Sequence, residues 1–311
     1  MNKKVDFIGI GAQKAGTTWL YENLSKIQEF DMPPIKELHY FDRSELYISI
    51  SKLKITSFWQ RITKFWYAKK AIRTIIRTFI KGLKTGNFKT FHFFRKLYLS
   101  TYNDKWYKSL FSKYTGYTGE ITPAYMFLEE KDIQIIYKIN PQIKIVFLLR
   151  NPIERAWSHY RFHNRNDSSF CVDEVDPAKI IEFMESKEQV LRSDYLGSIR
   201  NYHKYFNKDQ ILIGFYDAIS DNPKELMKNI LDHITNCEEI SFNYLNLQEK
   251  VNVSPRINCP EEVMSHLKIK YHDQIKKLSE IYGGYCSLWY YNTYESKSRS
   301  HIKSKSVTIY S

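Results

Sequence analysis

The chain has 311 residues, of which 43% are hydrophobic and 16% aromatic, and its formal net charge is +13. This apolar content excludes an intrinsically disordered chain, and the length suits one α/β domain that carries an insertion. The four cysteines lie far apart with no Cys-x-x-Cys pair, and no run of 18 uncharged apolar residues occurs. The sequence therefore signals no disulfide framework, zinc site or transmembrane helix.

The first predicted elements are a strand at residues 5–10, a glycine-rich loop and a helix at residues 17–27. The backbone N–H groups of such a loop and the N-terminus of the following helix favour binding of a phosphate. The loop is not a Walker A motif, because its lysine precedes the last glycine by two positions. The sequence therefore predicts an anion site, with simple turn chemistry as the alternative. Its candidate residues are Gln13, Lys14, Ala15, Gly16, Thr17 and Thr18.

Residues 44–103 form a basic segment that breaks this pattern. It contains 13 Lys or Arg residues and one acid, Glu45, a balance of +12, and its large apolar residues recur at three- and four-residue steps. This pattern predicts a basic amphipathic helical insertion. Three interpretations stay open: a lid or acceptor-binding flap, a membrane-surface helix, and a solvated charged face. Interleaved Trp and Phe favour burial of one face, and we do not expect nucleic-acid binding.

The rest of the chain alternates buried strands with helices. Further strands are predicted at residues 144–149 and 211–216, and helices at residues 130–139, 153–160, 177–191, 195–206, 223–234 and 260–281. This alternation predicts an α/β, P-loop-like domain over residues 1–294, with a central, mostly parallel sheet flanked by helices. The Ser- and Lys-rich residues 295–311 are expected to be a mobile tail.

Arg150 directly follows the second predicted strand, and Ser158 lies two helical turns later. An arginine at the end of a buried strand stands where α/β folds bind ligands, and its planar set of donors suits a phosphate. A surface salt bridge is the alternative interpretation of Arg150. The placement favours a ligand contact.

These motifs, in this order, resemble those of sulfotransferases that use 3′-phosphoadenylyl sulfate (PAPS), most closely the heparan sulfate sulfotransferase type and its bacterial relatives. The matching blocks are residues 11–18, 34–42, 120–125, 149–160, 195–206 and 287–289. Several ordered blocks are more specific than any one short motif. Two departures stand out: Ile121 replaces a lysine that is frequent in heparan-type relatives, and residues 252–256 keep little of the Lys-Gly-Arg cofactor loop.

The resemblance implies transfer of a sulfuryl group from PAPS to a hydroxyl or amine of an acceptor, which we expect to be a glycan or small alcohol. It implies that Glu37 is the general base and that His39, Thr122 and Tyr125 line the acceptor side. It assigns cofactor contacts to the loop residues named above and to Arg150, Ser158, Tyr195, Ser254 and Arg256.

The residue types suit these roles. Lys14 can stabilise the negative charge that builds on the oxygen between sulfur and the 5′-phosphate. Sulfuryl transfer needs in-line positioning more than covalent catalysis, and the low charge of the transferred group makes a metal unnecessary. Glu37 is the candidate base, with two alternatives: a surface carboxylate paired with Lys36, and His39 as the base.

Two other classes of function stay open. A P-loop kinase using ATP and magnesium is disfavoured because the Gly-Lys-Ser/Thr pattern is missing. A non-catalytic basic module would bind membrane or nucleic acid through residues 44–103. The apolar run that begins at Val5 leaves no room for a signal peptide, so we expect a cytoplasmic protein, with membrane association as an open alternative.

Overall fold

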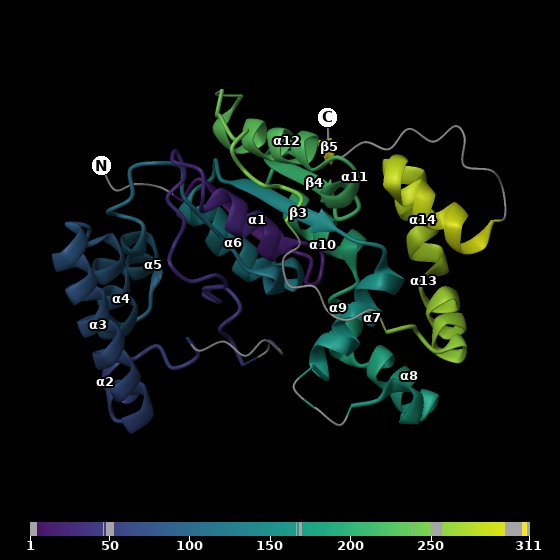
Figure 1. The fold of residues 1–311 in the computed structure, drawn as a ribbon, viewed down its shortest axis with the longest axis horizontal. Coiled ribbons are helices and arrows are strands. Elements are labelled where there is room, and N and C mark those ends of the chain that lie inside the picture. The colour runs from purple at the N-terminus through teal and green to yellow at the C-terminus, as the bar shows by residue number, and fades with distance from the viewer. Residues whose placement is uncertain are drawn as a thin grey trace.

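The computed structural model describes residues 5–45, 47, 53–165, 167, 170–237, 239–249, 257–295 and 307–309. At its centre is a five-stranded sheet in the order β2-β1-β3-β4-β5 (Figure 1). The first four strands are parallel, and β5 runs antiparallel to β4. The predicted α/β class with a mostly parallel sheet is confirmed. The strands are β1 Phe7–Gly11, β2 Gly119–Ile121, β3 Lys144–Leu149, β4 Ile211–Phe215 and β5 Val307–Ile309.

The strands β1, β3 and β4 are buried along almost their whole length. Strands covered by helices on both faces need apolar side chains on both sides, which explains their continuous apolar sequences. In the register, Gly9 of β1 pairs with Ile121 of β2 and with Val146 of β3. A Cβ atom on Gly9 would lie 2.9 Å from the Ile121 side chain, so glycine permits the close approach of these strands.

Helices surround the sheet (Figure 1). The helix α12 packs against β3 and β4, while α13 packs against α7, α8 and α14. The helices are α1 Thr17–Leu24, α2 Phe58–Ile62, α3 Phe65–Thr85, α4 Lys89–Leu99, α5 Asp104–Leu110, α6 Glu130–Ile139, α7 Pro152–His163, α8 Pro177–Glu185, α9 Lys187–Leu191, α10 Tyr195–His203, α11 Ala218–Asp221, α12 Pro223–Thr235, α13 Glu261–Tyr282 and α14 Gly284–Tyr294, with short 3-10 turns at η1 Pro123–Phe127, η2 Val172–Glu174 and η3 Lys208–Gln210.

The basic insertion is helical, as predicted, and its helices α2, α3 and α4 lie together at one side of the molecule (Figure 1). The buried guanidinium of Arg61 donates hydrogen bonds to the carbonyls of Ile55 and Thr56, before α2, and of Ser100, after α4. It also lies 3.7 Å from the ring centroid of Tyr102. These contacts hold the two ends of the insertion together.

No helix of the described residues is both long and apolar enough to cross a bilayer.

Two details differ from the pattern seen in the sequence. The predicted helix at residues 177–191 is divided at Ser186, whose hydroxyl caps α9 by accepting from the backbone N–H of Gln189. Residues 307–309, within the expected mobile tail, form β5 and so lie in the sheet. Of the remaining tail only Glu295 is described, so its mobility stays a prediction.

Candidate active site

The loop between β1 and α1 has the backbone shape of an anion site. Lys14 and Gly16 both have positive φ angles, 68° and 85°. A Cβ atom on Gly16 would lie 2.2 Å from the end of the Ile219 side chain, and the positive φ itself favours glycine. Gly16 is also the N-cap of α1 and has no side chain to cap it. The N-terminus of α1, which begins with Thr17 and Thr18, is thereby suited to a phosphate.

Lys14 lies among other cations. Its ammonium group is 4.1 Å from the ring centroid of Phe162 on α7. Burial and, after it, the nearby charges of Arg150, Arg165 and Arg161 and, more weakly, Lys36 together lower the pKa of Lys14 to about 8. A bound anion would relieve this repulsion. Two flanking residues, Gln13 and Ala15, complete the predicted loop.

Arg150 lies directly beyond β3 and faces the same loop. Its Nη1 donates to the carbonyl of Lys14 at 3.1 Å, and its guanidinium lies 4.3 Å from the ring centroid of Tyr216. Its Nη2 also donates to Oε2 of Glu154 at 3.1 Å, so the predicted surface salt bridge is present too. The contact with Lys14 joins the two predicted phosphate-binding elements, which are 136 positions apart in the chain.

The other predicted cofactor residues have different surroundings. Tyr195 is fully buried, and its hydroxyl donates to the backbone carbonyl of Arg150 at 2.9 Å, which makes it a positioning residue for that arginine. Ser158 is buried on α7. Ser254 and Arg256 lie outside the described residues, and contacts of all four with a nucleotide stay predictions.

Glu37 and His39 form an ion-paired cluster with their neighbours. Oε1 of Glu37 lies 2.5 Å from Nζ of Lys36, and Oε2 lies 3.5 Å from Nε2 of His39, whose Nδ1 is 2.7 Å from Asp42. Burial raises the pKa of Glu37, but the hydrogen bond from His39 and the charge of Lys36 outweigh it and bring that pKa to about 2. Burial lowers the pKa of His39, yet hydrogen bonds to Asp42 and Glu37 raise it to about 9. At neutral pH, His39 is therefore protonated and Glu37 is ionised.

Thr122 and Tyr125, predicted on the acceptor side, are buried around Glu120. The carboxylate of Glu120 accepts hydrogen bonds from Tyr107 at 2.6 Å, from Thr122 at 2.9 Å and from Tyr125 at 3.2 Å. The Tyr125 hydroxyl in turn accepts from the backbone N–H of Tyr40 at 2.8 Å, which anchors the segment that carries Glu37. To contact an acceptor, either hydroxyl would have to give up a hydrogen bond within the protein. The predicted role of Thr122 and Tyr125 on the acceptor side stays a prediction.

The family profile described as "Sulfotransferase domain" matches residues 4–240, which is more than half of the chain. This chain belongs to the sulfotransferase family. The assignment favours sulfuryl transfer over the P-loop kinase and the non-catalytic module.

The fold of this sulfotransferase resembles that of one solved sulfotransferase, and a second solved structure is more distant. The sulfotransferase from Alicyclobacillus acidocaldarius is 18% identical, with a TM-score of 0.59, over 92% of this chain and 99% of that one. The sulfotransferase domain from the curacin biosynthetic pathway is 13% identical, with a TM-score of 0.49, over 75% of this chain and 74% of that one. No curated protein matches the chain in sequence.

Besides Arg161 and Arg165, whose charges lower the pKa of Lys14, the sequence analysis missed two further side chains near the site of this sulfotransferase. One is Phe162, whose ring lies beside Lys14. The other is Arg192, a buried residue whose Nε donates to Glu188 at 2.8 Å. Burial holds the pKa of Arg192 below its usual value, although the charges of Glu188 and, more weakly, Glu37 act in the opposite direction. No motif marks either residue, because only the fold brings them to the site.

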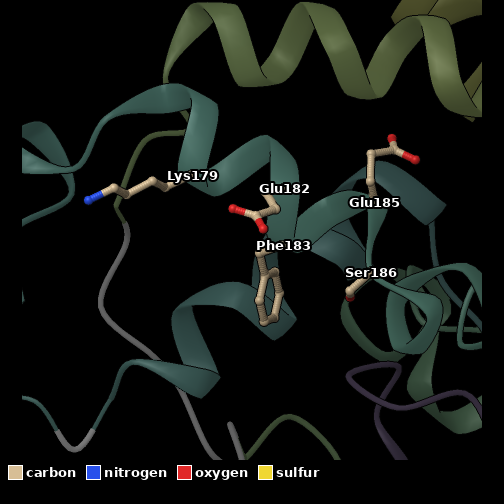
Figure 2. A pocket seen from close by; sticks show the side chains of 5 residues that line it. All are labelled: Lys179, Glu182, Phe183, Glu185 and Ser186. Atoms are coloured by element: carbon tan, nitrogen blue, oxygen red, sulfur yellow. The ribbon is translucent and has the colours of Figure 1, made fainter.

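A separate open hollow runs along α8 (Figure 2). Its lining residues are Lys179, Glu182, Phe183, Glu185 and Ser186. Glu185 points toward α13, where it lies 2.8 Å from Lys270 and 2.6 Å from His266 (Figure 2). None of the lining residues belongs to the loop or to the Glu37 cluster, so we assign the hollow no part in the site. In the described part of the chain, no cluster of His, Cys, Asp or Glu is placed to hold a metal ion.

We expect Glu120 to make the stability of this sulfotransferase depend on pH. Burial raises the pKa of Glu120 to about 7, although hydrogen bonds from Tyr107, Thr122 and Tyr125 oppose it, while its usual value is 4.5. The native protein therefore binds a proton that the unfolded chain has lost between these pH values. The free energy of unfolding should fall by up to roughly 3 kcal/mol as pH rises through this window.

Glu120→Gln should remove this part of the pH dependence, because glutamine cannot titrate. Urea unfolding of both proteins at a series of pH values from 4.5 to 8 measures the difference. Parallel pH profiles for the two proteins would contradict the assignment of the raised pKa to Glu120.

Proposed function

We propose that this sulfotransferase transfers a sulfuryl group from PAPS to a hydroxyl or amine of a carbohydrate or small alcohol. One observation carries the donor part of the proposal: the hydrogen bond from Arg150 to the carbonyl of Lys14, which joins two cationic elements beside the N-terminus of α1. A nucleotide with phosphates at both its 5′ and 3′ positions suits two such elements. The acceptor part rests on the resemblance of residues 34–42 and 120–125 to heparan-type relatives.

The residues of the loop fit the donor nucleotide. The loop ends at Gly16, the N-cap of α1, where the free backbone N–H groups of the helix N-terminus would bind a phosphate, and Lys14 would face the oxygen that joins this phosphate to sulfur. PAPS supplies the sulfuryl group as co-substrate. Lys14 would stabilise the charge that develops on the departing phosphate, while Arg150 and Ser158 would hold the 3′-phosphate.

Glu37 would accept the proton that the acceptor loses as its oxygen or nitrogen bonds to sulfur. With a pKa of about 2, Glu37 is a weak base as long as Lys36 and His39 both contact it. Lys36 can change this, because it contacts Glu37 and also lies near enough to Lys14 for its charge to lower the pKa of Lys14. A donor anion beside Lys14 would attract Lys36 and so raise the pKa of Glu37.

The product nucleotide 3′-phosphoadenosine 5′-phosphate should bind without added metal and stabilise the fold. At a concentration of one hundred times its dissociation constant, a ligand that binds only the native state adds about 2.7 kcal/mol to the free energy of unfolding. Thermal unfolding with this nucleotide, with adenosine 5′-phosphate and with ATP plus magnesium measures the effect. A shift seen only with ATP plus magnesium would refute the donor assignment. A sulfate-transfer screen over glycans and small alcohols then tests the acceptor.

A further inference from the structure

The helix α3 presents an apolar face to solvent. Its inner side, which includes Ala71 and Gly82, packs on α4. On the outer side, five large apolar side chains are each between 42% and 63% exposed, and they recur at helical spacing: Ile72, Ile76, Phe79, Ile80 and Leu83. We call these five residues the apolar face. Single exposed apolar residues are ordinary, but a row of them along one helix indicates a surface that binds a partner.

Cations flank the apolar face along the same helix. Six of them are exposed on α3, at Lys69, Lys70, Arg73, Arg77, Lys81 and Lys84, and α3 contains no acidic residue. Because 3.6 residues make one turn, those at positions 70, 73, 77, 81 and 84 form a strip beside the apolar face. A helix with adjacent apolar and basic strips matches the surface of a bilayer, where acyl chains lie beneath phosphate groups.

A shallow hollow on α3 adds a site of headgroup type. It is lined by Trp66, Lys69, Lys70, Arg73 and Thr74. The Trp66 side chain is 63% exposed. Tryptophan is enriched at the membrane–water interface, and three cations around it suit a phosphate group.

Packing contacts and a salt bridge join α3 to α4, and α4 to the central domain. Phe79 lies at the edge of the apolar face, where its ring is partly exposed and packs against Phe91 of α4 at 5.2 Å between centroids. On the inner side, a Cβ atom on Gly82 would lie 2.6 Å from the ring of Phe88. Lys89 at the start of α4 forms a salt bridge of 2.9 Å with Asp31 of the central domain. These contacts connect the apolar face of α3 with the rest of the protein.

We propose that the apolar face and basic strip of α3 dock this protein on an anionic lipid surface. Charge and apolar character together favour a lipid surface over a second copy of the chain or a nucleic acid. A second copy of the chain would bring the same cations into contact, within a segment whose balance is +12. A nucleic acid would neutralise the cations, but it would leave the four aliphatic side chains of the apolar face in water.

Co-sedimentation of the full chain with vesicles tests the proposal. We expect binding to vesicles of phosphatidylcholine mixed with phosphatidylserine, weaker binding at high salt, and little binding to phosphatidylcholine alone. Arg73→Gln with Arg77→Gln should weaken binding to the mixed vesicles by about 25-fold, since each cation near the surface contributes about fivefold. Ile76→Ser with Ile80→Ser should also reduce it strongly, because it removes apolar contact with the acyl chains.

Lys276→Gln with Lys277→Gln is the matched control, since it removes the same charge from exposed positions of α13 and should leave vesicle binding nearly unchanged. Circular dichroism and the nucleotide-induced thermal shift show that each variant is folded. Binding that ignores lipid charge, or that survives the Ile76 and Ile80 substitutions, would overturn the proposal. A concentration-dependent dimer abolished by those substitutions, without vesicle binding, would also overturn it in favour of a second copy.

Discussion

Glu37→Gln should lower sulfate transfer by at least about a hundredfold at saturating donor and acceptor, with normal folding and nucleotide binding. Glutamine keeps the shape of the side chain but cannot accept a proton. Loss of an ion pair at a partly exposed site would change stability by less than about 1 kcal/mol and would not affect turnover to this degree. Steady-state kinetics and nucleotide titration of the purified variant measure both quantities.

Two companion variants identify which group is the base. His39 is protonated at neutral pH, because hydrogen bonds to Asp42 and Glu37 overcome burial and raise its pKa to about 9. It therefore cannot accept the proton while these contacts last. If Glu37→Gln keeps near-normal turnover while His39→Ala abolishes it with the fold intact, the base is His39.

Lys36→Gln removes a contact that lowers the pKa of Glu37. The variant should therefore move the acidic limb of the pH–rate profile to higher pH.

Arg150→Ala should weaken binding of 3′-phosphoadenosine 5′-phosphate by roughly 10- to 100-fold, the range expected for losing charge-assisted hydrogen bonds. Binding of adenosine 5′-phosphate, which lacks the 3′-phosphate, should change little. Calorimetric titration of both nucleotides measures the two effects. Equal weakening of both would mean that Arg150 acts only through its hydrogen bond to the carbonyl of Lys14.

Glu154→Gln is the matched control for Arg150. It removes the carboxylate that lies 3.1 Å from Nη2 of Arg150 and leaves the guanidinium in place. Arg150 should then bind the 3′-phosphate at least as tightly as in the unmodified protein, because it no longer has a competing anion. Weakened 3′-phosphate binding in this variant would indicate that Glu154 positions the arginine.

The central strands were predictable because burial on both faces leaves a continuous apolar sequence. This holds for β3 and β4, whereas β2 and β5 escaped prediction. Each of the latter two has three residues, too few for a pattern, and each depends on a neighbouring strand that is far away in the chain. The division at Ser186 was also missed, because helical periodicity continues across it.

For the site, the sequence by itself determined which residue types stand after β1 and β3, because the turn at Gly16 and the position of Arg150 are local features. Only the tertiary structure decided the state of these groups. The pKa of Glu37 depends on Lys36 and His39 folding back onto one carboxylate, and the hydroxyl of Tyr125 is used within the protein by Glu120. Motifs specify residues over short stretches, whereas burial and charge depend on every group that the fold brings near.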